Sequence, residues 1–387
     1  MKTRLVIGMI AMFIALHQPC NGQTDTVQTD IPYLSMGQPL GLLSGHGYSN
    51  SATPSGLIAL AANPASITRI TQPEISVSYQ ASTSAKYDPF GRCSYSSSFP
   101  QSLSFVLPIK NFVFGLGAQQ NYNYKLVLNP IPITTAEHPD GTGEYYSAIF
   151  KTQVLNIGAI LAFAVDGLLC SRDRLSIGVQ INTNLYFHSE KILAASVDFN
   201  SSQTGYGLGL TYGYRLMKNE AIQFGLSYRP AYTFTSVAKL DKPDYEIPNF
   251  PAPKYAKGKL QLPAELRLGL SYELNAKTIF FCDYTMLSFD SFTNGDAEII
   301  EKQFSYGLKF PISTRCELSL ATLSKSPCTS VLVGNQWIFF TKMNYLMAGL
   351  TIATKNIAFD IALADTHLLP DNNLKYTLGK VGLSIFL

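Results

Sequence analysis

Charged residues are scarce in this chain. Asp, Glu, Lys and Arg make up 14% of its 387 residues, against about 25% in ordinary soluble domains. The Lys and Arg residues are scattered and the net charge is +3, so the sequence lacks the clustered basic face that a nucleic-acid partner requires. A long apolar run is also missing after residue 22, because the nearest approach, residues 154–170, is interrupted by Asn156 and Asp166. The sequence therefore predicts no transmembrane helix.

Cysteine is sparse, and its spacing does not suggest a metal site. The thiols expected beyond the first 22 residues are Cys93, Cys170, Cys282, Cys316 and Cys328. They form no C-x-x-C pair and no Cys/His cluster. So few cysteines in so long a chain do not make a disulfide framework. We expect isolated or incidentally paired thiols, no metal and no cofactor.

Histidine is equally sparse, which bears on catalysis. The chain holds five histidines, and none stands in a readable constellation with a serine nucleophile and an acidic partner. The run GYGLGL, residues 205–210, is glycine-rich, but no helix follows it, so it does not predict a phosphate-binding loop. Because triad partners can lie far apart in sequence, an enzyme stays open as the less favoured alternative. We expect a protein without enzymatic activity.

The N-terminus has the pattern of a secretory signal peptide. A basic start, MKTR, precedes an apolar run at residues 5–16, and the stretch HQPCNGQ follows. The apolar run is too short for a permanent membrane helix. We expect cleavage after Gly22 and Sec-dependent export. Cys20 raises the alternative of lipidation, but Gln and Pro stand before it where a lipobox has small residues.

The region beyond residue 70 is dominated by a period of two. In residues 260–272 every second residue is apolar, and the residues between them include Glu265 and Arg267. Such alternation predicts an extended strand with one apolar and one polar face. Similar patterns fill the predicted strands, which are 74–86, 95–108, 110–126, 148–166, 173–190, 203–217, 220–236, 258–274, 277–290, 301–311, 314–325, 343–354, 355–366 and 374–387.

The connections between these strands alternate between short and long. The longer ones are residues 127–146, 191–202, 239–257, 291–300, 326–342 and 366–374. Fourteen long strands with this alternation predict an all-β, transmembrane, up-and-down antiparallel barrel, with short periplasmic turns and longer outer loops. Closure is required because an open sheet edge has no hydrogen-bonding partners in hydrocarbon. The leucine face of residues 260–270 should then face lipid. The final SIFL resembles the terminal-strand signal that barrel-assembly machinery reads.

The polar faces of the last predicted strands should line the lumen. We expect a lumenal charge network that comprises Glu265, Arg267, Asp283, Lys309, Arg315 and Glu317. Mutual pairing that fills the barrel is the favoured role. A ring of charges that selects ions is the alternative, but the mixed signs speak against it.

Residues 23–72 differ from the strands that follow. They are rich in Gly, Ser, Ala and Pro and show neither a long amphipathic helix nor a strand pattern, yet they are too apolar for a disordered tail. We expect this segment to fold into the lumen. The predicted organisation is a signal peptide at 1–22, an N-terminal hatch or plug at 23–72 and an outer-membrane barrel at 73–387.

Three stretches resemble one family. ALAANPASI contains Asn63, Pro64 and Ala65, an NPA motif; residues 203–230 end in Gly-x-Ser-Tyr-Arg; and residues 262–291 contain Leu-Pro, Leu-Gly-x-x-Tyr and Asp-Tyr-Thr. In this order they resemble the FadL/TodX family of outer-membrane transport proteins for hydrophobic compounds. The resemblance runs from about residue 36 to the C-terminus.

The resemblance implies a fourteen-stranded barrel with an N-terminal hatch, to which the NPA motif would belong. It also implies capture of the ligand by two outer loops, although the first of these is short here. The residues assigned to capture are Ile192, Leu193, Val197, Phe199, Tyr245, Ile247, Phe250 and Tyr255. Gly115 and Gly117 could loosen a strand around an opening in the wall, or could be ordinary packing glycines.

The function implied is passive uptake of small hydrophobic molecules, such as long-chain fatty acids or related apolar compounds, across a Gram-negative-type outer membrane. Capture at outer loops, a lumenal apolar pocket and hatch-gated lateral release would be its steps. The expected partners are outer-membrane lipid and lipopolysaccharide, the ligand and the barrel-assembly machinery, with the protein a monomer. A non-transporting barrel that acts as a secretion-associated or receptor scaffold is the alternative, because one fold can serve several functions. A water-filled porin is a third.

Overall fold

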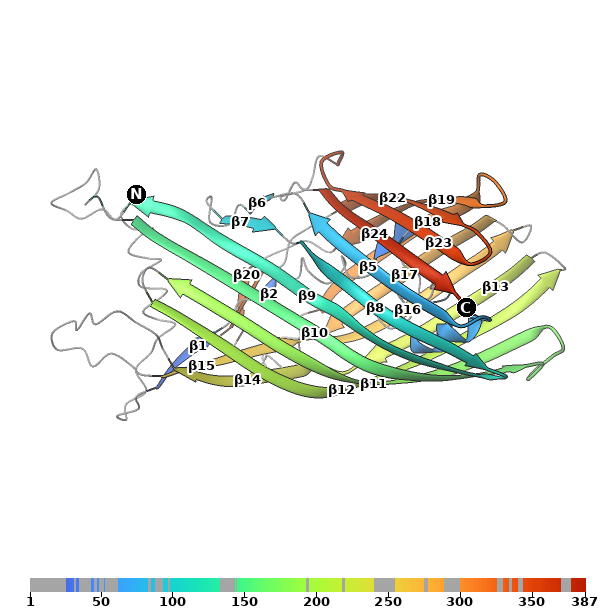
Figure 1. Cartoon of the computed structure of the whole chain (residues 1–387), viewed down its shortest axis with the longest axis horizontal. Helices are drawn as coiled ribbons and strands as arrows, with labels where there is room; N and C mark the ends of the chain where they lie inside the picture. Colours follow the sequence, from blue (N-terminus) through green and yellow to red (C-terminus); the bar gives the residue numbers. More distant parts are fainter. Residues whose placement is uncertain are drawn as a thin grey trace.

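The structure is a computed structural model of the whole chain (Figure 1). It describes residues 26–30, 33–34, 43–44, 47–48, 52, 62–82, 85–87, 93–96, 98–132, 143, 145–192, 195–217, 220–239, 255–274, 278–288, 300–325, 330–333, 336–339, 344–369 and 377–387.

The described chain forms a closed antiparallel barrel of fourteen strands, as the sequence predicts. Neighbouring strands follow the chain order, and the last strand pairs with the first from Leu378↔Ser82 to Phe386↔Glu74. The barrel strands are β5 (Glu74–Ser82), β8 (Ser98–Ile109), β9 (Phe112–Pro132), β10 (Tyr145–Asp166), β11 (Asp173–Ile192), β12 (Ala195–Met217), β13 (Glu220–Arg229), β16 (Ala264–Leu274), β17 (Thr278–Ser288), β18 (Ile300–Pro311), β19 (Cys316–Lys325), β22 (Asn344–Ala353), β23 (Ile357–Asp365) and β24 (Thr377–Phe386).

Shorter elements accompany the barrel. A 3-10 helix, η3 (Pro64–Arg69), precedes the first barrel strand. Three small sheets pair apart from the closed wall, and one further pair of strands, β6 and β7, joins the wall at β9. These strands are β1 (Thr26–Asp30), β2 (Tyr33–Leu34), β3 (Leu43–Ser44), β4 (Gly47–Tyr48), β6 (Ala85–Tyr87), β7 (Cys93–Ser96), β14 (Tyr232–Lys239), β15 (Tyr255–Leu262), β20 (Ser330–Val333) and β21 (Gln336–Phe339).

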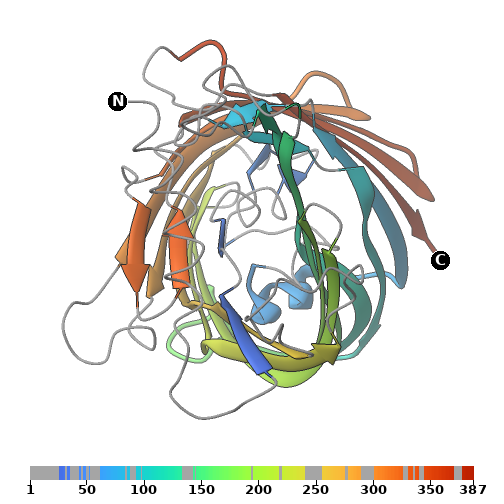
Figure 2. The same ribbon diagram turned by 90° about the vertical axis from the view of Figure 1, so that its left-hand side faces the viewer.

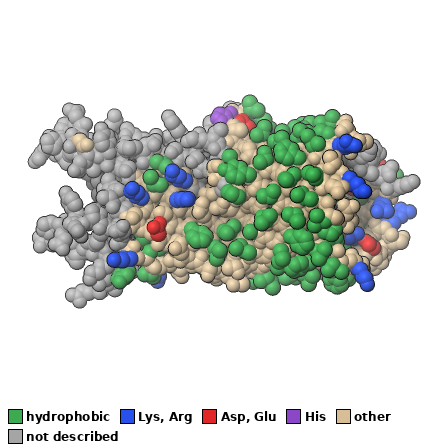
Figure 3. Space-filling model, viewed as in Figure 1, with side chains coloured by type: hydrophobic (Ala, Val, Ile, Leu, Met, Phe, Trp, Pro, Cys, Tyr) green, Lys and Arg blue, Asp and Glu red, His purple; other side chains and the backbone are tan. Residues whose placement is uncertain are grey.

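The two faces of the barrel wall have opposite chemistry. Large apolar side chains point outward and are exposed, and Figure 3 shows them as a band with Lys and Arg beyond its margins. Members of this apolar belt include Leu103, Ile157, Ile177, Leu208, Leu268, Phe304, Leu320 and Leu383. Polar side chains point inward and are buried, among them Ser76, Gln80, Ser104, Asn184, Gln223, Ser271 and Thr285. A hydrocarbon-facing exterior and a polar lumen are what a membrane-spanning barrel requires.

The strand at 264–274 shows the rule directly. Leu268 and Leu270 are exposed on the outer face, whereas Glu265 and Arg267 are buried on the inner face. The prediction that the leucine face points outward is confirmed for this strand. In the described part of the chain, no helix has the length and apolar character needed to cross a membrane.

Two prolines break strands that the alternation predicts to be continuous. The predicted strand 220–236 is divided at Pro230 into β13 and β14, and the predicted strand 258–274 is divided at Pro263 into β15 and β16. Proline has no N–H group to donate to a ladder, and the last wall pair is Arg229↔Glu265. The β14–β15 hairpin then leaves the wall to form a separate sheet. Leu262, expected to face outward, is accordingly buried.

The structure also corrects the predicted loops. Residues 191–202 are predicted as a loop, but β11 continues to Ile192 and β12 begins at Ala195. The reason is that Val197 and Phe199 alternate as buried residues with the exposed Asp198 and Asn200, which is a strand pattern. Strands likewise take up both ends of the predicted loop 127–146, and the predicted loop 326–342 contains the β20–β21 hairpin.

A charge placed in the apolar belt tests this orientation. We expect Leu268→Arg to lower the free energy of unfolding in lipid vesicles by about 2–4 kcal/mol, because hydrocarbon does not solvate a guanidinium group. Asp198→Arg is the matched control, since the exposed Asp198 already places a charge on the outward-pointing side of β12, and its cost should stay near 0–1 kcal/mol. Equal effects in urea titrations of the two variants would contradict the assigned belt.

Candidate functional site

The segment that precedes the first barrel strand contains a self-stabilised turn, which we call the NPA turn (residues 62–70). Asn63 caps η3: its Oδ1 accepts a hydrogen bond of 3.0 Å from the backbone N–H of Ala65. Pro64 stands at the start of the helix, where its missing N–H costs nothing. The Asn-Pro pair therefore sets both the cap and the first helical residue, as these residue types do elsewhere.

The NPA turn lies inside the barrel, where Figure 2 shows the short light-blue helix within the ring of strands. Two glycines on the inner face of the wall make room for it. A Cβ atom on Gly178 would come closer than 3.0 Å to backbone atoms of Pro64 and Ala65, and one on Gly209 would overlap Asn63 and Pro64. At Gly178 the turn is thus packed backbone against backbone, and at Gly209 the side chains of Asn63 and Pro64 lie directly on the strand, approaches that only glycine permits.

Hydrogen bonds fix the NPA turn to three strands. Asn63 Nδ2 donates to the carbonyl of Leu210 at 3.1 Å, and Ser227 Oγ donates to the carbonyl of Ala62 at 2.6 Å. Thr68 Oγ1 donates to Ser176 Oγ at 2.9 Å. In addition, Arg174 Nη2 donates to the Thr68 carbonyl at 2.9 Å. The turn is held by β11, β12 and β13 together.

An apolar contact anchors the other side of the turn. Ile67 is buried among Val106, Val113, Ile160 and Ala162 of strands β8, β9 and β10. A Cβ on Gly115 would lie 3.5 Å from Ile67 Cδ1, so this glycine leaves space for the isoleucine. Burial of one such side chain is worth roughly 1.5–3 kcal/mol.

Above the NPA turn, the inner face of β11 carries three amides in succession, Gln180, Asn182 and Asn184. Asn184 Oδ1 accepts from Asn156 Nδ2 at 3.0 Å and from Asn182 Nδ2 at 3.2 Å. Asn184 Nδ2 in turn donates to the carbonyl of Gln203 at 3.4 Å. This polar strip continues the lumenal face toward the long-loop end of the barrel.

An aromatic cluster stands beyond the amides. The ring of Tyr186 stacks on Phe234 of β14 with centroids 5.2 Å apart, and His188 lies between Tyr186 and Phe199. His188 also contacts Thr152 Oγ1 at 2.6 Å and Glu190 Oε1 at 2.9 Å. Because Phe234 belongs to β14, the cluster attaches the β14–β15 hairpin to the barrel wall.

The hairpin covers part of β12 as well. The ring of Tyr232 lies over Gly205, where a Cβ would overlap it. Its hydroxyl donates to the carbonyl of Tyr206 at 2.9 Å. Burial raises the pKa of the Tyr232 phenol.

The structure divides the predicted lumenal charge network into two groups. Glu265 contacts Arg267 and also Arg229, the latter at 4.0 Å, and Asp283 is buried on the inner face of the next strand. Lys309 and Glu317 pair at 2.5 Å nearer the short turns. Arg315 is exposed in the turn between β18 and β19, apart from the other five. Sequence reasoning missed the pair Lys325–Glu301, 3.1 Å apart and almost fully buried.

The residues assigned to ligand capture are only partly described. Val197 and Phe199 are buried on the inner face of β12, and Tyr255 is exposed at the start of β15. The backbone of Ile192 ends β11. The remaining assigned residues lie outside the described chain; they are Leu193, Tyr245, Ile247 and Phe250. Their role in capture stays a prediction.

The barrel wall is interrupted between β8 and β9. Their ladder runs from Ile109↔Phe112 to Ser102↔Gln119, and β9 is paired again with β7 only at 125–128. Among the described residues, 120–124 of β9 have no ladder partner on this side, a span of about 16 Å at 3.3 Å per residue. Gly115 and Gly117 are paired on both sides, so they lie in the continuous part of the wall below it.

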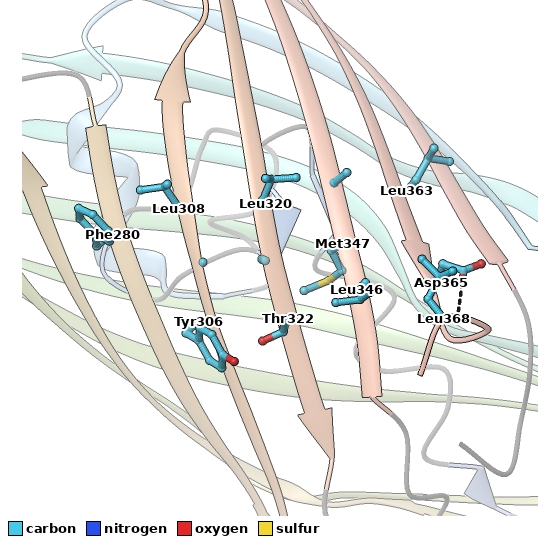
Figure 4. Close-up of a pocket in the computed structure, with 13 residues that line it drawn as sticks. Phe280, Tyr306, Leu308, Leu320, Thr322, Leu346, Met347, Leu363, Asp365 and Leu368 are labelled. Carbon is cyan, nitrogen blue, oxygen red and sulfur yellow. Dashed lines mark hydrogen bonds between the residues drawn. The ribbon is translucent and has the colours of Figure 1, made fainter. Parts of the chain in front are cut away.

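The outside of the barrel carries an apolar groove (Figure 4). Its volume is about 640 Å³, and it crosses β17, β18, β19, β22 and β23 between Phe280 and Leu368. Tyr306, Leu320 and Leu363 line it from the outer face. The groove therefore belongs to the surface that the apolar belt presents to lipid.

Neither the cysteines nor other possible ligands form a metal site in the described part of the chain. Cys170 and Cys316 are free thiols, and Cys282 is half-buried on β17. Cys93 has only its backbone described, and Cys328 lies outside the described residues. No group of three or more His, Cys, Asp or Glu side chains suited to a metal ion occurs in the described chain.

Several solved structures share this fold. The toluene transporter TbuX of Ralstonia pickettii is 14% identical and has a TM-score of 0.59, with 90% of this chain and 98% of that chain covered. The P. putida toluene transporter TodX is 13% identical with a TM-score of 0.61, covering 89% and 97%. A Pseudomonas aeruginosa FadL homologue is 13% identical with a TM-score of 0.56, covering 90% and 98%.

The chain thus has the fold of the FadL- and TodX-type barrels, as the three sequence motifs suggest. No family model matches the sequence. No curated protein matches it significantly either. At 13–14% sequence identity, the likeness to these structures shows a shared fold.

The glycines that make room for the lumenal contacts on β12 were not predicted, although their spacing in the sequence is a signal for them. GYGLGL places Gly205, Gly207 and Gly209 at every second position, hence on one face of β12. A strand face without side chains indicates a close approach by another part of the chain. Here that face receives the NPA turn and the ring of Tyr232. By contrast, the sequence does not show that the strand breaks at Pro230 and Pro263 lie side by side. That becomes visible only once the pairing of β13 with β16 and of β14 with β15 is known.

The glycine contact beneath the NPA turn gives a test. In Gly178→Ala the new methyl group would push the turn away from the wall, and overpacking of this kind costs about 1–3 kcal/mol. We expect amide hydrogen exchange in residues 62–70 to become about tenfold faster. Gly382→Ala is the control, because its Cβ would meet described atoms no closer than 3.5 Å. Unchanged protection in Gly178→Ala would show that the turn does not depend on this contact.

Proposed function

We propose that this protein is an outer-membrane transporter, related to the FadL/TodX family, that mediates passive uptake of small hydrophobic molecules. The observation that carries the proposal is the interruption of the wall between β8 and β9 in a barrel that holds the NPA turn inside. The fold that this chain shares with two toluene transporters supports the same reading.

A wall opening suits an apolar cargo. A molecule that leaves through the side of a barrel enters hydrocarbon directly, so it never has to dissolve in water. A pore for polar solutes has no use for such an exit, because hydrocarbon would reject its cargo. The unpaired edge at 120–124 of β9 is tolerable where it lines a cavity or is covered by a ligand, and not where bare backbone faces lipid.

The N-terminal segment, residues 23–72, would act as the hatch. The NPA turn is its described anchor, fixed to β11, β12 and β13 by hydrogen bonds and to β8–β10 by Ile67. Movement of the segment would admit the ligand to the lumen and then release it toward the wall opening. Export by a signal peptide at 1–22 and capture by the outer loops complete the route that we propose.

Uptake is the direct test of this function. Cells that display the barrel in their outer membrane should accumulate a labelled long-chain fatty acid or labelled toluene faster than cells without it. The purified barrel should bind at least one of the two ligands saturably. A barrel that lacks residues 23–61 should give large, steady conductance in planar bilayers, and the intact protein should not. Neither uptake nor saturable binding of either ligand would overturn the proposal.

The exit route can be closed with a disulfide. Continuation of the β8–β9 register beyond Ser102↔Gln119 sets position 101 against position 120. In a background with the native cysteines replaced by alanine, we expect oxidised Gln101→Cys/Gln120→Cys to lose most uptake while it still binds ligand. Reduction should restore uptake, because only the wall has been sealed.

A second pair controls for the presence of a disulfide. Ser102→Cys/Gln119→Cys joins two residues that are already ladder partners, so its oxidation should leave uptake unchanged. If the sealed variant transports as fast as this control, the cargo leaves by another route.

A further inference from the structure

The N-terminal segment is paired through β1 with a hairpin at the outer end of the barrel. The five residues of β1 form a parallel ladder with β15 that begins at Thr26↔Tyr255. β15 continues past Pro263 into β16, which runs to the short turn before β17, so β15 comes from the long-loop end. Because the pairing is parallel, Thr26 also lies at the long-loop end, where Figure 1 shows β1 beside β15.

A second strand of the segment makes the same kind of contact. β2 pairs in parallel with β21, at Tyr33↔Ile338 and Leu34↔Phe339. In the chain, the β14–β15 hairpin lies between β13 and β16, and the β20–β21 hairpin lies between β19 and β22. The start of the N-terminal segment is therefore tied to hairpins that come from two separate parts of the wall.

The β14–β15 hairpin is itself fixed to the wall. The ring of Tyr232 lies over Gly205, and Ser236 Oγ donates to the carbonyl of Asn200 at 2.8 Å. As long as β1 is paired with β15, the outer end of the N-terminal segment is held by this hairpin. That end can move on its own only when the ladder between β1 and β15 parts.

The two ends of the segment are held with unequal strength. At the short-turn end, the NPA turn packs on Gly178, buries Ile67 and is hydrogen-bonded to three strands. At the outer end, β1 is an edge strand that pairs on one side only among the described residues. Parallel ladders are slightly less stable per residue than antiparallel ones, and local opening starts at the elements that are held least. The outer end should therefore open first.

We propose that β1 is a latch at the outer end of the hatch. Opening parts β1 from β15 and leaves the NPA turn in place, so the hatch moves about its short-turn end. Because an isolated two-stranded hairpin is only marginally stable, release of β1 also loosens the β14–β15 hairpin and couples the hatch to the outer mouth. The inference rests on the proposed transport function and specifies which end of the hatch moves.

A disulfide between β1 and β15 tests the latch in the full-length mature protein. Gln28 and Lys257 are ladder partners, and adjacent strands lie about 4.8 Å apart, a separation that a disulfide bridges. In a background with the native cysteines replaced by alanine, oxidised Gln28→Cys/Lys257→Cys should lose most uptake of labelled toluene or labelled fatty acid. Reduction should restore uptake, because only the latch has been fixed.

The control moves the same cross-link by one strand. Val237 of β14 is the antiparallel ladder partner of Lys257, and both side chains are exposed. Oxidised Val237→Cys/Lys257→Cys joins two strands that stay paired in the proposal. Its uptake should equal that of its reduced form.

Hydrogen exchange in the wild type reports the order of opening without a transport measurement. We expect the hydrogen-bonded amides of β1 to exchange at least about tenfold faster than those of the NPA turn, because the latch opens while the turn stays packed. Equal or slower exchange in β1 would overturn its assignment as the moving end.

The outcomes separate the latch from the transport function. Uptake that is unaffected by oxidation of Gln28→Cys/Lys257→Cys, or lost equally in both oxidised variants, overturns the latch and leaves transport standing. If the latch pair forms no disulfide while the control pair does, the latch is overturned as well, because β1 and β15 are then not paired. A wild type that takes up neither labelled toluene nor labelled fatty acid overturns the proposed function itself.

Discussion

The constraint on which the structure depends is that backbone N–H and C=O groups find no partners in hydrocarbon. Fourteen strands meet it by closing on themselves through the pairing of β24 with β5. In contrast to a soluble protein, the barrel has apolar side chains on its outer face and polar side chains on its inner face. Leu268 accordingly faces outward and Arg267 is buried. Among the described residues, the ladder between β8 and β9 is interrupted at 120–124 of β9, and the exit route that we propose is based on this interruption.

Inside the closed wall, parts of the chain that are distant in sequence pack against the strands. The inner face of β12 lacks side chains at Gly205, Gly207 and Gly209, and the chain uses this space twice. The NPA turn packs on Gly209 from one side, and Tyr232 of the hairpin packs on Gly205 from the other. Between them, Gly207 lies under the side chains of Gln180 and Arg229.

Sequence reasoning reached the barrel because period-two alternation is a local signal that each strand carries by itself. It could also place the NPA motif in a lumenal segment, through resemblance. It could not place the β14–β15 hairpin. A proline such as Pro230 indicates that a ladder is interrupted, but it does not indicate in which direction the chain continues. That direction is set by contacts distant in sequence, Tyr232 on Gly205 and Phe234 on Tyr186.

The central claim is that alternate residues of one strand face lipid and lumen. It is tested most directly by spin labels placed singly at positions 266–271 of the barrel in lipid vesicles. The account predicts that labels at 266, 268 and 270 collide with oxygen dissolved in the bilayer, and that labels at 267, 269 and 271 do not. A collision rate without a period of two, or with the opposite phase, would contradict it.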